Sequence, residues 1–234
     1  MKDFIDKLFS NPEMLRMGHA QRPEDSNLGL GWLYYALGRM FHPERVVVIG
    51  SYRGFVPAVL AKSLLDNDEQ GEVIFIDPSY ADDYWKDPGK VQQHFSELGL
   101  SAVKHYLYTT QDFVNTGVYK DLSNIGIVMV DGYHSAEQAR FDYLAFMEKM
   151  AEDSVFLFHD SVRQRTSTMY GNDRAYEHTV CQLMDRMRET RGLESITLPF
   201  GSGVTMVTGR PDTLDIINRP FECDVQELAG TTTA

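Results

Sequence analysis

Carboxylate and imidazole side chains follow several apolar runs of the sequence, close to the residue where each run ends. They are Asp77 after residues 73–76, Asp112 beyond the weaker run 104–108, Asp131 and His134 after 125–130, and His159 and Asp160 after 155–158. A histidine with a pKa near neutral can remove the proton of a hydroxyl nucleophile, and a divalent metal on that oxygen would make the proton more acidic. His134 could act in this way, or it could satisfy a helix N-terminus or pack under a sheet. Asp131 and Asp160 could hold the metal, or they could cap loops.

A pair of glycines follows an earlier apolar run, in the segment Gly50-Ser51-Tyr52-Arg53-Gly54. Glycine lets a ligand approach the backbone closely, and the N-terminus of a following helix favours an anionic group. The spacing differs from the dinucleotide-binding pattern G-x-G-x-x-G, because Tyr52 and Phe55 occupy the other glycine positions. Asp77 could accept both hydroxyl groups of a ribose, or it could form an Asx turn next to Pro78.

Buried strands that alternate with helices would bring these residues together. The expected strands are 46–49, 73–76, 104–108, 125–130 and 155–158, followed by a hairpin of 195–198 and 204–207. The expected helices are 28–41, 55–65, 88–97, 135–150 and 174–191. Short, unbroken apolar runs suit parallel strands covered on both faces, and such sheets bind ligands at the carboxyl ends of their strands. The sequence therefore predicts an α/β fold with a Rossmann-like, seven-stranded, mostly parallel sheet, a C-terminal antiparallel hairpin and helices on both faces.

Charge and composition narrow the classes of partner. The 234-residue chain has 22 Lys and Arg against 34 Asp and Glu, a formal net charge of −12. Nucleic acids and anionic membranes need a basic surface, so we expect neither as a partner. Cys181 and Cys223 have no metal-binding spacing and fit reduced thiols. Acidic residues near the N-terminus and the lack of a long apolar run argue against a signal peptide and a membrane span, so we expect a cytoplasmic protein.

The predicted sheet with its terminal hairpin looks like that of the class I S-adenosylmethionine-dependent methyltransferases. Two strand ends, Asp131-Gly132-x-His134-Ser135 and Phe158-His159-Asp160, carry a closer resemblance to one small-molecule methyltransferase family. That family includes the macrolide-sugar O-methyltransferases and the cephalosporin-biosynthesis hydroxylase-like protein. The resemblance covers roughly residues 45–208.

The resemblance implies methyl transfer from S-adenosylmethionine to a small-molecule acceptor. The favoured acceptor atom is a hydroxyl oxygen. The implied site residues are Gly50, Ser51 and Gly54 at the methionine part of the cofactor, Asp77 at its ribose, Thr110, Gln111 and Asp112 near its adenine, Asp131, His159 and Asp160 around a divalent metal such as Mg or Mn, and His134 as the catalytic base beside Asp131.

Two positions depart from the pattern of this family. Val48 stands where the family usually has an acidic residue, which removes a hydrogen-bonding group near the cofactor loop. His159 stands where the metal-using members usually have an acidic residue. Oxygen ligands suit magnesium and imidazole suits softer transition metals, so this change favours another metal, or none.

Two further functions stay open beside methyl transfer. One is a non-catalytic protein that retains the fold and the cofactor. The other is a nicotinamide-dependent oxidoreductase. The glycine spacing and the lack of a Tyr-x-x-x-Lys pair argue against this second alternative. We divide the chain into a helical extension of residues 1–44, a methyltransferase-like domain of residues 45–210 and a tail of residues 211–234. The N-terminal helices could form a lid, or they could join the subunits of a homo-oligomer.

Overall fold

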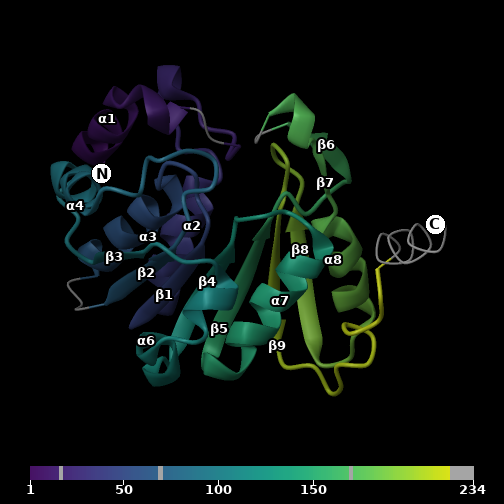
Figure 1. Ribbon diagram of the computed structural model, residues 1–234. Coiled ribbons are helices and arrows are strands. Elements are labelled where there is room, and N and C mark those ends of the chain that lie inside the picture. The colour runs from purple at the N-terminus through teal and green to yellow at the C-terminus, as the bar shows by residue number, and fades with distance from the viewer. Residues whose placement is uncertain (16–17, 68–70, 169–170, 222–234) are drawn as a thin grey trace.

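The computed structural model describes residues 1–15, 18–67, 71–168 and 171–221, and its centre is a seven-stranded sheet (Figure 1). The strands are β1 (Arg45–Ile49), β2 (Glu72–Ile76), β3 (Val103–Tyr106), β4 (Ile125–Val130), β5 (Met150–His159), β8 (Leu193–Leu198) and β9 (Val204–Gly209). They lie in the order β3-β2-β1-β4-β5-β9-β8, and β9 is antiparallel to both of its neighbours. The predicted fold class is therefore confirmed, including the terminal antiparallel hairpin.

Helices cover both faces of this sheet. They are α1 (Lys2–Ser10), α2 (Gly31–Phe41), α3 (Phe55–Asp66), α4 (Pro88–Glu97), α5 (Thr110–Phe113), α6 (Gly117–Asp121), α7 (Ala136–Phe146) and α8 (Val180–Glu189). Successive residues of β1 show how the two faces are filled: Val46 and Val48 pack with α2 and α3, whereas Val47 and Ile49 pack with α7 and α8. Because side chains of a strand alternate between faces, a sheet with two cores needs unbroken apolar strands.

Side-chain caps begin two of these helices as the sequence predicts. Asp87 accepts hydrogen bonds from the amides of Gly89 and Lys90 at the start of α4, and Ser135 accepts one from the amide of Gln138 at the start of α7. These caps satisfy amides that have no partner within the helix.

One helix prediction was too long. In the stretch expected to be helical over 135–150, α7 ends at Phe146 and a short 3-10 helix over Met147–Lys149 continues up to Met150, which pairs with β4 as the first residue of β5. By contrast, the helix expected over 174–191 begins at Val180, because the preceding residues form β7 (Tyr176–His178), which pairs with β6 (Arg165–Ser167) in a small second sheet.

Segments near both ends of the described chain pack against the central domain. Phe4, Ile5 and Leu8 of α1 are buried in the core that α2 and α3 share. Ile217 and Phe221 are buried in the other core, next to α7 and α8. Residues 222–234, which include Cys223 and most of the predicted tail, lie outside the described residues, whereas Cys181 is a free thiol on α8.

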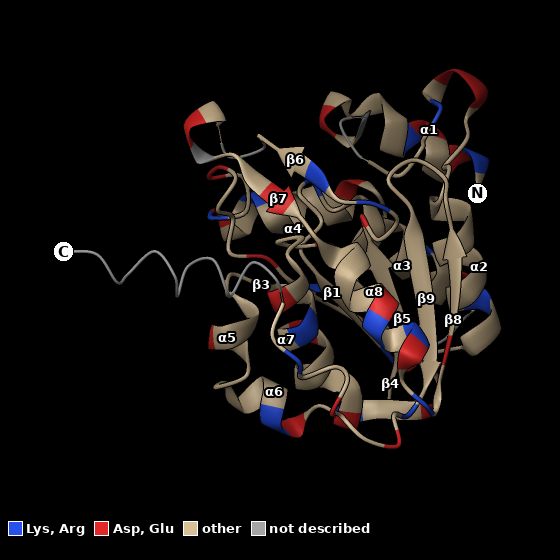
Figure 2. Ribbon diagram, turned by 90° about the vertical axis from the view of Figure 1, so that its right-hand side faces the viewer, with Lys and Arg blue, Asp and Glu red and all other residues tan. Residues whose placement is uncertain are grey.

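Charged residues lie mainly on the helices and loops. Helix α8 carries both acidic and basic residues, whereas β9, in the sheet behind it, has none (Figure 2). No described helix combines the length and apolar character that crossing a membrane requires.

Candidate active site at the carboxyl ends of the strands

A cavity of about 880 Å³ opens at the carboxyl ends of β1, β2, β4 and β5. Among the residues predicted from the sequence, those that line it are Gly50, Ser51, Asp77, Thr110, Gln111, Asp131, His134, His159 and Asp160. Gly54 and Asp112 do not line it. The volume lies in the range of small-molecule sites, so the cavity can accept a ligand of cofactor size.

The glycine loop after β1 owes its shape to close packing. Gly50 has a φ of +71°, and a Cβ on it would lie 2.5 Å from the carbonyl oxygen of Asp131. Gly54 has a φ of +81° and immediately precedes α3, and a Cβ there would lie 3.0 Å from Trp85. Glycine is therefore required at both positions, and only Gly50 exposes its backbone to the cavity.

Asp77 lies at the end of β2 and is buried at the cavity wall. Its Oδ1 accepts a hydrogen bond of 2.7 Å from the amide of Ser79, so the Asx turn expected from the sequence is present. Burial raises the pKa of Asp77 to about 6, although hydrogen bonds from the backbone of Ser79 and Ser51 oppose the shift. The carboxylate is therefore mainly ionised at pH 7 and can accept hydrogen bonds from hydroxyl groups.

The segment expected near adenine divides between the cavity and the outer surface. Thr110 and Gln111 face the cavity, whereas exposed Asp112 accepts a hydrogen bond from Thr109 at the start of α5. Gln111 donates to Gln138 of α7, whose amide group donates in turn to Asp142 over 2.8 Å.

Asp142 is a cavity residue that the sequence did not reveal. Burial raises its pKa to about 7, although hydrogen bonds from Thr110 and Gln138 oppose the shift. It lies within α7, away from the strand ends at which we sought functional residues. Its place in the sequence therefore did not mark it as a candidate.

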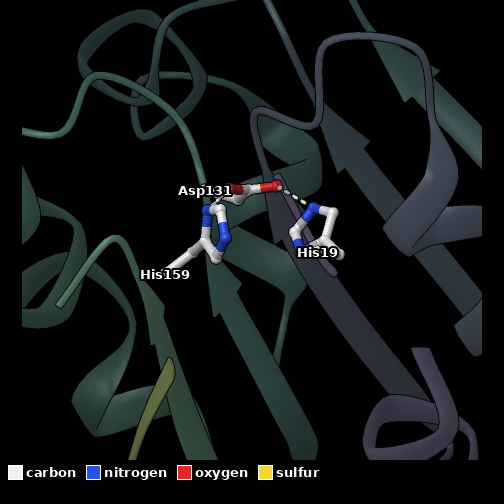
Figure 3. Close-up of side chains that lie close together, drawn as sticks. All are labelled: His19, Asp131 and His159. Carbon is white, nitrogen blue, oxygen red and sulfur yellow. Dashed lines mark ion pairs between the residues drawn. The ribbon is translucent and has the colours of Figure 1, made fainter. Parts of the chain in front are cut away.

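Asp131 lies between two imidazole rings (Figure 3). Its Oδ1 is 2.7 Å from Nδ1 of His159, and its Oδ2 is 3.3 Å from Nε2 of His19. Asp131 and His159 meet because β4 and β5 are neighbouring parallel strands, with Val130 opposite Phe158. His19 comes from the loop before α2, far away in the sequence.

The charges of this group stabilise one another. Burial tends to raise the pKa of Asp131, but His159 and His19 outweigh it and hold that pKa well below its ordinary value. Burial tends to lower the pKa of His159, but Asp131 outweighs it and raises that pKa. Burial lowers the pKa of His19, and the neighbouring His159 lowers it further.

Asp160 forms a second charged group with the β6–β7 hairpin. It has a left-handed φ of +54°, and its Oδ2 lies 2.6 Å from Nδ1 of His178 and 2.5 Å from a guanidinium nitrogen of Arg165. Burial tends to raise the pKa of Asp160, but the bond from His178 and the nearby His134 outweigh it and lower that pKa strongly. Asp160 is therefore ionised across the physiological pH range.

His134 lies between the two carboxylates. Its Nε2 is 3.5 Å from Oδ2 of Asp160 and 4.0 Å from Oδ1 of Asp131, and its buried Nδ1 has no hydrogen-bond partner within the described part of the chain. Burial lowers the pKa of His134 to about 4, so the ring is neutral at pH 7. The side chain lines the cavity, and Ser135 rather than His134 caps α7.

Two histidines of the cavity were missed by the sequence analysis. His19 and His178 follow none of the strands expected from the sequence, and their neighbours in the chain form no metal-binding motif. Four of the seven histidines line this cavity. They are separated in the sequence and come together only in the folded chain.

The sheet order and the strand-end cavity define a class I methyltransferase fold. Residues 47–161 match the family model of a methyltransferase domain, and this stretch holds β1 to β5. The chain therefore contains a methyltransferase domain. This result favours methyl transfer over the nicotinamide-dependent alternative. No curated protein sequence matches the chain significantly.

Solved methyltransferases share the fold at low sequence identity. An O-methyltransferase from Bacillus cereus in complex with S-adenosylhomocysteine has a TM-score of 0.64 and 12% identity, with 89% of this chain and 91% of that chain covered. The O-methyltransferase TomG of Streptomyces achromogenes, involved in tomaymycin synthesis and in complex with S-adenosylmethionine, has a TM-score of 0.60 and 13% identity, with 88% of each chain covered. A Podospora anserina methyltransferase bound to S-adenosylhomocysteine has a TM-score of 0.58 and 13% identity, with 89% and 86% covered.

Proposed function

We propose that this protein transfers the methyl group of S-adenosylmethionine to a hydroxyl oxygen of a small molecule. One observation carries the proposal: a single cavity joins the glycine loop and Asp77 on one side to Asp131 and His134 on the other. The first pair suits a nucleoside cofactor, and the second suits an acceptor that must lose a proton. Solved O-methyltransferases with the same fold, in complex with the cofactor or its product, support this direction.

The cofactor half of the cavity fits S-adenosylmethionine, which supplies the methyl group when bound. Gly50 leaves backbone accessible beside the methionine part, and ionised Asp77 can accept both ribose hydroxyls. Thr110 and Gln111 would face the adenine. Gly54 would act through the shape of its loop, and Asp112 through the cap of α5.

In the acceptor half, His134 would remove the proton of the hydroxyl nucleophile. We assign this role to Nδ1, which is buried without a hydrogen bond in the described structure, while Nε2 carries its proton toward Asp160. The ring is neutral before the reaction because its pKa is about 4, and Asp160 and Asp131 stabilise the positive charge that it then acquires. Such proton transfer typically contributes ~10²–10⁴-fold to the rate.

A divalent metal fits the same half of the cavity. The ligands predicted from the sequence, Asp131, His159 and Asp160, all line the cavity at the ends of β4 and β5. Such an ion, when bound, would lower the pKa of the acceptor hydroxyl and help to orient it. Since His159 offers an imidazole, the donor set favours a transition metal over magnesium.

Two further predictions concern the surroundings of the protein. Helix α2 exposes Trp32 and Met40, which could join subunits of a homo-oligomer, and sedimentation analysis would reveal the oligomeric state. A cytoplasmic location remains a prediction from the sequence.

Thermal unfolding tests the cofactor assignment. We expect S-adenosylmethionine and S-adenosylhomocysteine at millimolar concentration to raise the melting temperature, and NAD to leave it unchanged, because a ligand stabilises the folded state that binds it. Stabilisation by NAD alone would overturn the proposal.

Variants of two buried histidines test the base. On a panel of phenols, catechols and sugars, methyl transfer from labelled S-adenosylmethionine should fall by ~10²–10⁴-fold in His134→Ala, with cofactor binding retained. His94 is equally buried, but it pairs with Tyr84 and lies outside the cavity, so His94→Ala is the matched control. Normal turnover in His134→Ala would refute the base. Cofactor binding with no turnover in the unmodified protein would instead support a non-catalytic role.

A further inference from the structure

We propose that His19, Asp131 and His159 form a transition-metal site, and that the N-terminal segment supplies one of its three ligands. This inference rests on the proposed function for the role of the metal in methyl transfer. The site itself rests on the geometry of the three side chains.

The three side chains converge at one point of the cavity wall (Figure 3). One ligand atom from each lies within 4.8 Å of the others. The side chains of His19, Asp131 and His159 are only 3%, 6% and 5% exposed. A cation between them would be held by the protein on one side, while the cavity would leave room for further ligands on the other.

The outer nitrogens of both rings already have partners. Nε2 of His159 lies 3.2 Å from the carbonyl oxygen of Gly18 and 3.1 Å from the hydroxyl of Ser202. Nδ1 of His19 lies 3.1 Å from the hydroxyl of Tyr34. A carbonyl oxygen only accepts hydrogen bonds, so Nε2 of His159 carries the proton. Metal-binding histidines typically donate their second ring N–H in this way, which orients the ring and leaves the other nitrogen as the ligand.

The inner nitrogen of His159 then lacks a suitable partner within the described part of the protein. Nδ1 of His159 makes no hydrogen bond of regular geometry in the described chain, although it lies 2.7 Å from Oδ1 of Asp131. A nitrogen lone pair facing a carboxylate oxygen at this distance is repelled by it. A cation between the two would remove the repulsion and satisfy both groups. A proton on His159 would do the same, and experiment separates the two cases.

The donor set points to the class of metal. Two imidazole nitrogens and one carboxylate suit divalent iron, cobalt, nickel or zinc, whereas magnesium prefers oxygen ligands. Asp160 is less available than His19, because its Oδ2 is bound by His178 and Arg165. Its buried Oδ1 has no hydrogen-bond partner among the described residues and could complete the coordination.

His19 would couple metal binding to the position of the N-terminal segment. The same segment contributes Gly18, whose carbonyl oxygen accepts from His159, so residues 18–19 bind to the site at two points. The extension expected from the sequence to form a lid or an interface would thus complete the metal site.

Titration of the metal-stripped full chain with Co²⁺ tests the proposal, because the visible absorption of Co²⁺ reports its ligands. We expect the unmodified protein to bind one Co²⁺ that excess Mg²⁺ does not displace. His19→Ala should weaken binding by at least ~100-fold, a larger loss than outer-sphere changes typically give. His94→Ala should bind as the unmodified protein does, and Asp160→Asn should lose less Co²⁺ affinity than His19→Ala does.

Thermal stabilisation by S-adenosylmethionine is measured on each variant, without metal, to confirm folding. Should His19→Ala lose that response, His19→Gln would replace it, because Gln keeps a polar group near Tyr34. Unchanged Co²⁺ affinity in the His19 variant, or no Co²⁺ binding by the unmodified protein, would overturn the metal site while leaving the proposed function intact. Lack of stabilisation by S-adenosylmethionine in the unmodified protein would instead refute the proposed function.

Discussion

Asp77 and Asp131 occupy equivalent places after parallel strands of one sheet, yet their ionisation shifts in opposite directions. Asp77 contacts backbone amides, and burial raises its pKa to about 6. Asp131 is equally buried, but two imidazole rings outweigh the effect of burial and lower its pKa strongly. The comparison shows that a strand end brings a carboxylate to the cavity, whereas the neighbours from other segments decide its charge.

In the proposed function, this difference assigns separate tasks to the two halves of the cavity. The Asp77 side offers a carboxylate with room for hydroxyl partners, as recognition of a ribose needs. The Asp131 side gathers two carboxylates and four imidazoles, which can take up a proton or hold a metal. Variants of the two residues should therefore fail in different ways.

The largest effect is expected from Asp131→Asn. It removes the charge that would hold a metal and stabilise protonated His134, so kcat should fall by ~10³-fold or more while the Kd for S-adenosylmethionine changes little. Steady-state kinetics and calorimetry measure the two quantities. Asp153→Asn, at the exposed opposite end of β5, is the control and should be unaffected. Loss of cofactor binding with normal kcat would reverse the assignment of the two halves.

Asp77→Asn should show the complementary pattern. It removes a charged acceptor for the ribose hydroxyls, and hydrogen bonds to charged groups are worth ~1.5–3 kcal/mol, so the Kd for S-adenosylmethionine should rise by ~10–100-fold. Co²⁺ binding should be unchanged, because Asp77 is not among the residues that could hold a metal ion. Weakened Co²⁺ binding would show that the two halves are not independent.

The same contrast explains how far the sequence could predict the site. Asp77, Asp131 and Asp160 were found because each follows an apolar strand, and parallel strands bring their carboxyl ends to one edge. His19 and His178 were missed because a loop and a short hairpin carry them there, and neither segment has a periodic pattern. Asp142 was missed because a buried acid in a helix looks like a surface residue when only its neighbours in the chain are known.

A smaller effect is expected from pH. The pKa of Asp77 is about 6, so at pH 5 this side chain is protonated in most molecules. A protonated Asp77 can no longer accept hydrogen bonds from both ribose hydroxyl groups. The affinity for S-adenosylmethionine should fall by ~10-fold between pH 7 and pH 5. Asp77→Asn should show a flatter profile in the same titration. An equally steep profile in that variant would assign the pH dependence to another group.

The smallest effect concerns Asp142, another carboxylate of the cavity, which has no cationic partner among its described contacts. Its pKa is about 7 when folded against an ordinary value of 3.8, so the folded state binds the proton more tightly. The stability that this proton provides is present below pH 3.8 and is lost as the pH rises through 7. An amide in place of the carboxylate keeps an acceptor for Gln138 without the buried charge, so Asp142→Asn should raise the melting temperature by ~5 °C at pH 8. The gain in melting temperature should shrink at pH 5, where Asp142 of the folded protein is already neutral. An equal gain at both pH values would show that the ionisation of Asp142 is not its cause.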